Sequence, residues 1–210
     1  ESIKTDSRFA LQSTGLVFGD RALDITKLEQ DAEVLIKEGQ TAYDNLETDV
    51  ATKKFEQALQ KYEDALGELD SYKGAAKVAL LAAAAPLLSN NDKQGRALIQ
   101  KALLYDPNCA PDPRIFNSGM MNVFKDVKQK SRKGQTGSLS VTSNPTYAEL
   151  YIDGDFVGLT PDKIDRISVG PHLVRLVRDG FRPLVQVVDV KGGKGDVPYT
   201  LNLIALPEQA

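Results

Sequence analysis

The chain holds two residues whose side chains could form a nucleophile and its base, Cys109 and His172, and they are its single Cys and single His. A Cys–His pair activates a thiolate only when the two side chains lie within hydrogen-bonding reach. Here they fall in segments predicted to belong to different domains. We therefore expect no nucleophile pair.

Each of these residues has a simpler structural interpretation. His172 alternates with Val174 and Leu176, which predicts a structural histidine bonded to a turn. Cys109 lies in the Pro107–Pro113 loop and is expected to be a buried, inert thiol rather than a redox or attachment site. With one cysteine, the chain forms no disulfide within itself and no cysteine-rich metal site.

Two further sequence patterns could bind a ligand, one a calcium ion and the other a phosphate group. Four carboxylates gather near expected turns and could bind calcium, but their spacing is not that of a calcium loop, and turn formation is favoured. They are Asp153, Asp155, Asp162 and Asp165. The glycine-rich run 191–195 lacks the Gly-Lys-Ser/Thr ending of a phosphate loop. The sequence therefore predicts no enzyme, no cofactor and no bound metal.

The C-terminal third has the pattern of short strands. Leu139 and Val141 alternate with polar residues, and Ala148, Leu150 and Ile152 share one face. Later runs at 172–177, 184–190 and 197–203 repeat the pattern, and Gly and Pro separate them. Asp153-Gly154 and Asp179-Gly180 are tight-turn signals. This organisation predicts a small all-β sandwich or barrel.

Residues 26–133 have helical periodicity instead. Apolar residues recur at intervals of three and four, and the expected buried stripe of the first helix is Leu28, Ala32, Leu35, Ile36, Gly39, Ala42, Tyr43 and Leu46. A second helix is expected to be capped by Asp49, a third to span 72–88, and a fourth to be capped near 90–92 with Ala97 inside. A fifth is expected to start at Asp112-Pro113. The longest apolar run, 78–88, is too short to span a membrane.

The β segment resembles the PEGA domain, a small non-catalytic module of bacterial and archaeal envelope proteins. The resemblance rests on Ser143-Asn-Pro145, on Ile152-Asp-Gly154 with Gly158-x-Thr-Pro161, and on Gly170-x-His172 with Gly180-Phe181. The family usually has Gly before the Ala of its first motif, where this chain has Tyr147. Either that turn avoids positive φ, or Tyr147 is strained.

The helical segment resembles tetratricopeptide repeats, with Gly39, Phe55 and Ala58 in a first unit and Gly95 in a second. The offset from Ala51 to Gly95 exceeds the usual period, so the first unit's second helix is expected to be overlong. The chain is thus predicted to be α then β, with a TPR-like bundle followed by a PEGA-type sandwich. The expected parts are an N-terminal arm (1–25), a helical domain (26–133), a linker (134–137) and a β domain (138–205).

Charge is unevenly distributed along the chain. Residues 1–70 hold 8 basic and 16 acidic side chains, a net of −8, and residues 71–136 hold 11 and 4, a net of +7. Solvated helix faces explain this, and attraction between neighbouring copies or guidance of a partner is the alternative. A chain of overall net charge −3 is not expected to bind nucleic acid.

The architecture predicts a scaffold or adaptor of a bacterial envelope assembly, periplasmic or at the cell surface, with envelope proteins or neighbouring copies as partners. The alternative is a glycan- or peptidoglycan-binding module with Tyr147, Tyr151 and Tyr199 as aromatic contacts. The candidate protein contacts are Phe9, Leu16, Phe18, Tyr43, Lys125, Lys128 and Arg132, and those of the β module are Tyr147 and Tyr151. The arm is expected to dock on a partner. A start at Glu1 fits removal of a leader, or trimming.

Overall fold

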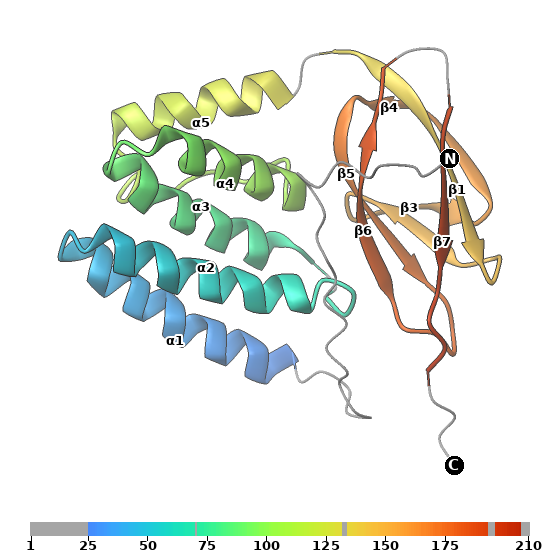
Figure 1. Ribbon diagram of the computed structural model, residues 1–210, viewed down its shortest axis with the longest axis horizontal. Coiled ribbons are helices and arrows are strands. Elements are labelled where there is room, and N and C mark those ends of the chain that lie inside the picture. The colour runs from blue at the N-terminus through green and yellow to red at the C-terminus, as the bar shows by residue number, and fades with distance from the viewer. Residues whose placement is uncertain (1–24, 70, 132–133, 193–195, 207–210) are drawn as a thin grey trace, which may run out of the picture. The chain divides into compact units, whose positions relative to one another are not determined.

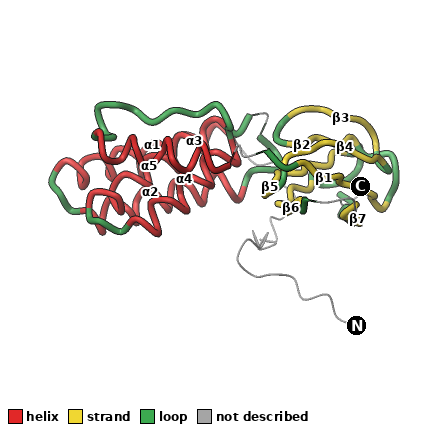
Figure 2. The backbone as a smooth tube through the Cα atoms, turned by 90° about the horizontal axis from the view of Figure 1, so that it is seen from above, coloured by secondary structure: helices red, strands yellow, loops and turns green. Residues whose placement is uncertain are grey.

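The structure is a computed structural model, and it describes residues 25–69, 71–131, 134–192 and 196–206. The described residues form two compact units that divide between Gly134 and Gln135. Helices make up the first unit and strands the second (Figures 1 and 2). The predicted order of α then β is confirmed.

Five helices form the first unit of the described chain. They are α1 (Ile25–Asp44), α2 (Thr48–Asp64), α3 (Lys73–Leu88), α4 (Asp92–Tyr105) and α5 (Ser118–Ser131). Each helix packs mainly on its neighbour in the sequence, so the helices stack in chain order (Figure 1). An array of this kind is stabilised by contacts between adjacent elements.

Small residues bring the helices close together. In α1, a Cβ at Gly39 would lie 2.7 Å from Cε1 of Phe55, so the glycine makes room for that ring in α2. Nearly all of α3 is buried, and this includes Pro86, which is inside the helix. The alanine-rich sequence of α3 therefore serves close packing inside the protein. No helix among the described residues is both long enough and apolar enough to cross a membrane.

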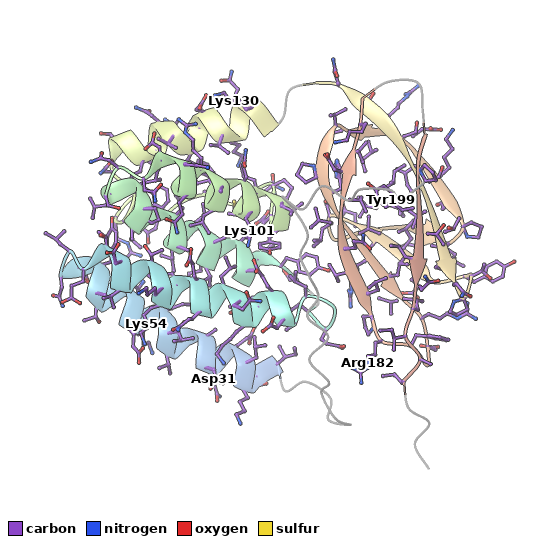
Figure 3. All side chains as sticks on the ribbon, in the orientation of Figure 1. Asp31, Lys54, Lys101, Lys130, Arg182 and Tyr199 are labelled. Atoms are coloured by element: carbon purple, nitrogen blue, oxygen red, sulfur yellow. The ribbon has the colours of Figure 1, made fainter. Side chains whose placement is uncertain are left out.

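Ion pairs and a hydrogen bond reinforce the stack at its surface, and Figure 3 labels Asp31, Lys54 and Lys101 among the residues that take part. Lys54 lies 2.6 Å from Glu38, and Lys61 lies 3.3 Å from Asp31, so both pairs join α2 to α1. Between α4 and α2, Glu63 accepts from Lys101 at 2.8 Å and from Tyr105 Oη at 2.7 Å. Exposed pairs contribute only ~0–1 kcal/mol each, so apolar packing dominates.

Several expectations for the helices are wrong in detail. Leu46 is exposed because it takes a left-handed conformation, φ 63°, just after α1 ends. Asp49 lies in the first turn of α2, and the cap position is Glu47, whose side chain makes no capping bond. Ala97 is exposed on α4. Asn91 does cap α4 by accepting from the Gln94 amide, as predicted.

The fifth helix begins later than Asp112-Pro113. Residues 112–117 form turns, and α5 begins at Ser118 after Asn117, whose side chain accepts from the Met120 amide at 3.0 Å. The side chain of Asp112 binds Arg114 instead. α2 has 17 residues and is shorter than the 20-residue α1, so it is not the overlong helix that the repeat offset required. Tetratricopeptide geometry stays a prediction.

The second unit contains two sheets of the seven described strands. The strands are β1 (Thr136–Asn144), β2 (Glu149–Ile152), β3 (Asp155–Leu159), β4 (Asp162–Ser168), β5 (Gly170–Val177), β6 (Leu184–Val190) and β7 (Asp196–Asn202). One sheet has the order β4-β1-β7 and the other the order β3-β2-β5-β6. β3 is therefore an edge strand.

The core of this unit lies between the two sheets and follows the predicted alternation. Leu139 and Val141 of β1 and Leu150 of β2 are fully buried and pack in one cluster with Val174 and Leu176 of β5. The expected turn after β2 is present, with positive φ at Asp153 and Gly154. The strand pattern thus positions the core as the sequence predicts.

The expected linker is partly strand. β1 begins at Thr136, where residues 136 and 137 pair with Ser168 and Ile167 of β4. Gly137 cannot carry a side chain, because a Cβ there would lie 2.2 Å from the Lys191 carbonyl oxygen. The backbone of β1 therefore lies close to the residue that follows β6. The strands of the β unit begin at Thr136, inside the expected linker.

Candidate protein-docking surfaces

His172 is held by a hydrogen-bond network that engages both of its ring nitrogens. Its Nδ1 lies 2.6 Å from Asp153 Oδ2, and its Nε2 lies 2.7 Å from the Ser168 carbonyl oxygen. Both partners are acceptors, and a doubly protonated ring donates to each of them, while the Ser168 hydroxyl lies 3.1 Å from Nε2. The prediction of a histidine bonded to a turn is confirmed.

The protonation of His172 results from opposing effects. Burial of the ring is the largest effect and by itself lowers the pKa, but the hydrogen bond and charge of Asp153, with the Ser168 carbonyl, outweigh it. The pKa of His172 is therefore raised above its ordinary value. Asp153 also accepts from the Leu173 amide at 2.9 Å, so the pair fastens the β2–β3 turn to β5.

Cys109 is a free thiol that is buried in the helical unit. Burial, followed by the charge of Asp106, raises the pKa of its thiol to about 11, although Lys128 opposes this. A thiolate is scarce at neutral pH under these conditions. The predicted burial of Cys109 is confirmed.

Three of the four carboxylates near the strand turns, those of Asp153, Asp162 and Asp165, have partners within the protein. Asp165 accepts from Ser138 Oγ at 2.8 Å, and Asp162 accepts from the Lys163 amide at 2.8 Å. Within the described ranges, no three His, Cys, Asp or Glu side chains lie close enough together to hold a metal ion. These bonds support turn formation as the role of the aspartates.

Tyr43, a predicted contact residue, is half-buried and connects two parts of the helical unit. Its hydroxyl donates to the Ile115 carbonyl at 3.2 Å, across 72 positions of sequence. Desolvation, with the charge of Asp44, raises the pKa of this tyrosine. The loop 106–117 that Tyr43 holds also lies beside α3, where Lys77 and Leu80 line a shallow hollow with Cys109. Tyr43 thus has a structural partner.

The predicted basic contacts at α5 differ in exposure. Lys125 is exposed. Lys128 donates to the Cys109 carbonyl at 3.1 Å and lies 5.4 Å from the Phe124 ring centroid, so it helps to close the loop 106–117. Phe9, Leu16, Phe18 and Arg132 lie outside the described residues, as does the predicted arm. Lys125 is the described basic candidate most available to a partner.

Tyr147 is strained and exposed. Its φ is 61° and its side chain is 71% exposed. Of the two possibilities raised by the sequence, the turn therefore does not avoid positive φ, and Tyr147 is strained. The backbone is fixed there because Tyr147 N–H donates to the Thr160 carbonyl at 2.7 Å and Thr160 N–H donates to the Ala148 carbonyl. A left-handed conformation costs a non-glycine residue ~1–2 kcal/mol. The usual glycine at this position is therefore what the local backbone favours.

Tyr151, the other predicted β contact, is in a row of side chains across the four-stranded sheet. Arg175 lies over its ring at 5.5 Å, and Phe156 meets it edge-on at 5.4 Å. Its hydroxyl donates to Glu149 at 2.8 Å, which raises the pKa of Tyr151. With the guanidinium over it, this ring has less surface to offer a ligand than Tyr147.

Sequence reasoning missed a group of exposed apolar residues on β3. Phe156 is 59% exposed and Leu159 is 49% exposed, both on the edge strand β3, and Val157 between them is exposed too. With Tyr147, Tyr151 and Glu149 they define the β2–β3 surface. Exposed apolar groups gathered in this way mark interaction sites. The signal available in the sequence was the uncharged run 156–159 after a tight turn.

Comparison with known families supports the identity of the β unit. Residues 136–203 match the family model of the PEGA domain, which covers all seven strands. No curated protein matches the chain. The helical unit is therefore characterised by its structure alone.

Proposed function

We propose that this chain is a non-catalytic scaffold or adaptor that mediates protein–protein interaction in a bacterial cell-envelope assembly, in the periplasm or at the cell surface. The observation that carries the proposal is the combination of a PEGA domain, an envelope-associated module, with helices that stack in chain order. Stacked helical pairs commonly present extended faces to other proteins.

The chemistry of the two most reactive residue types supports a non-catalytic role. Both nitrogens of His172 are engaged by acceptors, and the Cys109 thiol keeps its proton at neutral pH. A catalytic group needs a free atom and a pKa suited to its task. Neither residue offers both.

Photo-cross-linking in the native cell tests the proposal. A photoreactive amino acid would replace Val34 on α1, Lys125 on α5 or Phe156 on β3, which are exposed positions on different surfaces. The buried Ile99 position is the control. We expect discrete cross-links to envelope proteins or to copies of the chain at one or more exposed positions. Only a free monomer at every position would contradict the proposal.

A glycan- or peptidoglycan-binding module is the second candidate, and Tyr147 favours it. An exposed ring on a rigid backbone suits stacking against a sugar, whereas Tyr199 is half-buried and packs against the core. Sedimentation with purified cell walls at low salt tests this role. Pelleting that Tyr147→Gly abolishes would support it, and absence of pelleting would reject it.

A further inference from the structure

His172 connects the two sheets of the β unit through one peptide group. The ring is buried on β5, in the four-stranded sheet. Its Nε2 lies 2.7 Å from the carbonyl oxygen of Ser168, the last residue of β4 in the other sheet. The N–H of the same peptide group belongs to Val169 and donates to the Gln135 carbonyl at 2.9 Å. A single peptide group therefore joins the histidine ring to Gln135.

Gln135 lies where the chain enters the β unit. The two compact units divide between Gly134 and Gln135, and β1 begins at the next residue. Thr136 and Gly137 pair with β4, but the ladder is irregular between Gly137 and Ser138. This irregularity separates the first two pairs from the rest of the β1–β4 ladder, so they can open while the remainder stays paired.

The ring has a further partner that suits its neutral form. With both nitrogens protonated, Nδ1 donates to Asp153 and Nε2 donates to the Ser168 carbonyl. The bond to the carboxylate is charge-assisted and therefore the stronger of the two, so Nε2 is the nitrogen that releases its proton. Its lone pair then opposes the carbonyl oxygen, whereas the Ser168 hydroxyl, 3.1 Å away, can rotate to donate to it. The neutral ring thus repels the carbonyl that the charged ring holds.

We propose that His172 is a protonation switch that determines where the ordered part of β1 begins. In the protonated state the peptide group after β4 is held at the ring, and this bond polarises the group and strengthens its N–H as a donor to Gln135. In the neutral state the peptide group turns away, its N–H leaves the Gln135 carbonyl, and pairing begins at Ser138. Residues 135–137 then join the connection between the two units, which lengthens by up to ~3.3 Å per residue.

The charges around the ring set the direction of the switch. Asp153, from the turn between β2 and β3, contacts the ring, and Asp189 of β6 acts on it through its charge while pairing with Lys191. Burial is the largest effect and lowers the pKa of His172, but these carboxylates and the Ser168 carbonyl outweigh it and raise the pKa. The paired state is therefore complete below about pH 6.5, the ordinary histidine pKa, and is lost as pH rises through the raised value.

NMR spectroscopy of the full chain tests the switch residue by residue. The ring carbons of His172 and the amide of Val169 should titrate with the same midpoint. Corrected for the intrinsic rate at each pH, hydrogen exchange at Val169 should become at least about tenfold faster as the ring loses its proton. The reference is the amide of Thr160, which donates to the Ala148 carbonyl at 2.9 Å and should keep its protection.

Two substitutions should move the switch in opposite directions. Asp153 has a φ of 52°, which Asn tolerates, so Asp153→Asn removes the charge and should lower both midpoints by about one pH unit or more. Ser168→Ala removes the hydroxyl that suits the neutral ring and should raise both midpoints by about 0.5–1 pH unit. The matched control is Ser138→Ala, which removes a hydroxyl bonded to Asp165 and should leave both midpoints in place.

Three results would overturn the inference: exchange at Val169 that does not follow the ring, a variant that shifts the midpoint of the ring without that of Val169, or a ring midpoint that Ser168→Ala leaves unchanged. If Asp153→Asn loses the folded β unit, Ser168→Ala carries the test alone, because it removes only a hydroxyl. Midpoints that move together in the predicted directions support the switch. The adaptor proposal is independent of either outcome, because the switch names no partner.

Discussion

The helical unit and the PEGA-type unit reach stable cores by different routes. The helices pack neighbour on neighbour, and glycines at the crossings allow close approach, as Gly39 does for Phe55. The β unit joins strands distant in sequence, and its turns include left-handed residues such as Tyr147 and Asp153. The comparison shows that the helical unit is built locally, whereas the β unit depends on a few specific turns.

The largest expected effect tests whether the two units are stable independently. Phe55→Ala should destabilise the helical unit by ~3–5 kcal/mol, and Leu150→Ala should destabilise the β unit by ~2–5 kcal/mol. Both side chains are almost fully buried. Hydrogen exchange followed by mass spectrometry should show faster exchange in the altered unit only. Equal acceleration in both units would show that they unfold as one.

A smaller effect is expected at the His172–Asp153 pair. His172→Gln leaves Asp153 without its charged partner and should destabilise the β unit by about 1.5–3 kcal/mol near pH 5.5. Because the folded pKa of His172 is raised, its stabilisation is complete below the unfolded pKa of about 6.5 and is lost as pH rises through the folded pKa.

Urea denaturation of both proteins from pH 5 to 9 measures this dependence. The difference in the free energy of unfolding between wild type and His172→Gln should shrink as pH rises. The control is Ser138→Ala, which removes a hydrogen bond to Asp165 and leaves the histidine unchanged. A difference that is constant with pH would contradict the raised pKa.

A further prediction concerns Gly39, the glycine of α1 that packs against Phe55 of α2. Alanine favours a helix over glycine by about 1 kcal/mol, but a Cβ at residue 39 would lie 2.7 Å from the Phe55 ring. Overpacking costs ~1–3 kcal/mol, so we expect Gly39→Ala to destabilise the helical unit by about 1 kcal/mol in urea. In a Phe55→Leu background the same change should be neutral or stabilising. Stabilisation in the wild-type background would show that the helices separate readily.

Local patterns predicted much of both units, and tertiary context decided the rest. The alternation around Leu150, the Asp153-Gly154 turn and the Asn91 cap all depend on adjacent residues, and the structure has each of them. The start of α5 could not be predicted in this way, because Asp112 binds Arg114 and Asn117 supplies the cap.

Exposure on the β2–β3 surface illustrates the same limit. Strand alternation assigns one face to the core, but it does not show that β3 is at the edge of its sheet, where Phe156 and Leu159 stay accessible. The departure at Tyr147 was visible in the sequence, yet its φ of 61° follows from the bonds to Thr160. The exposure of the β2–β3 surface is therefore known only from the structure.

The smallest change bears most directly on the central claim that exposed surfaces, rather than a catalytic centre, carry the function. Tyr147→Gly removes a strained conformation and an exposed ring in one step. We predict that it raises the free energy of unfolding of the β unit by about 1 kcal/mol in urea and that it weakens cross-linking to partners from a photoreactive residue in place of Phe156. A variant that is both less stable and equally cross-linked would contradict the account.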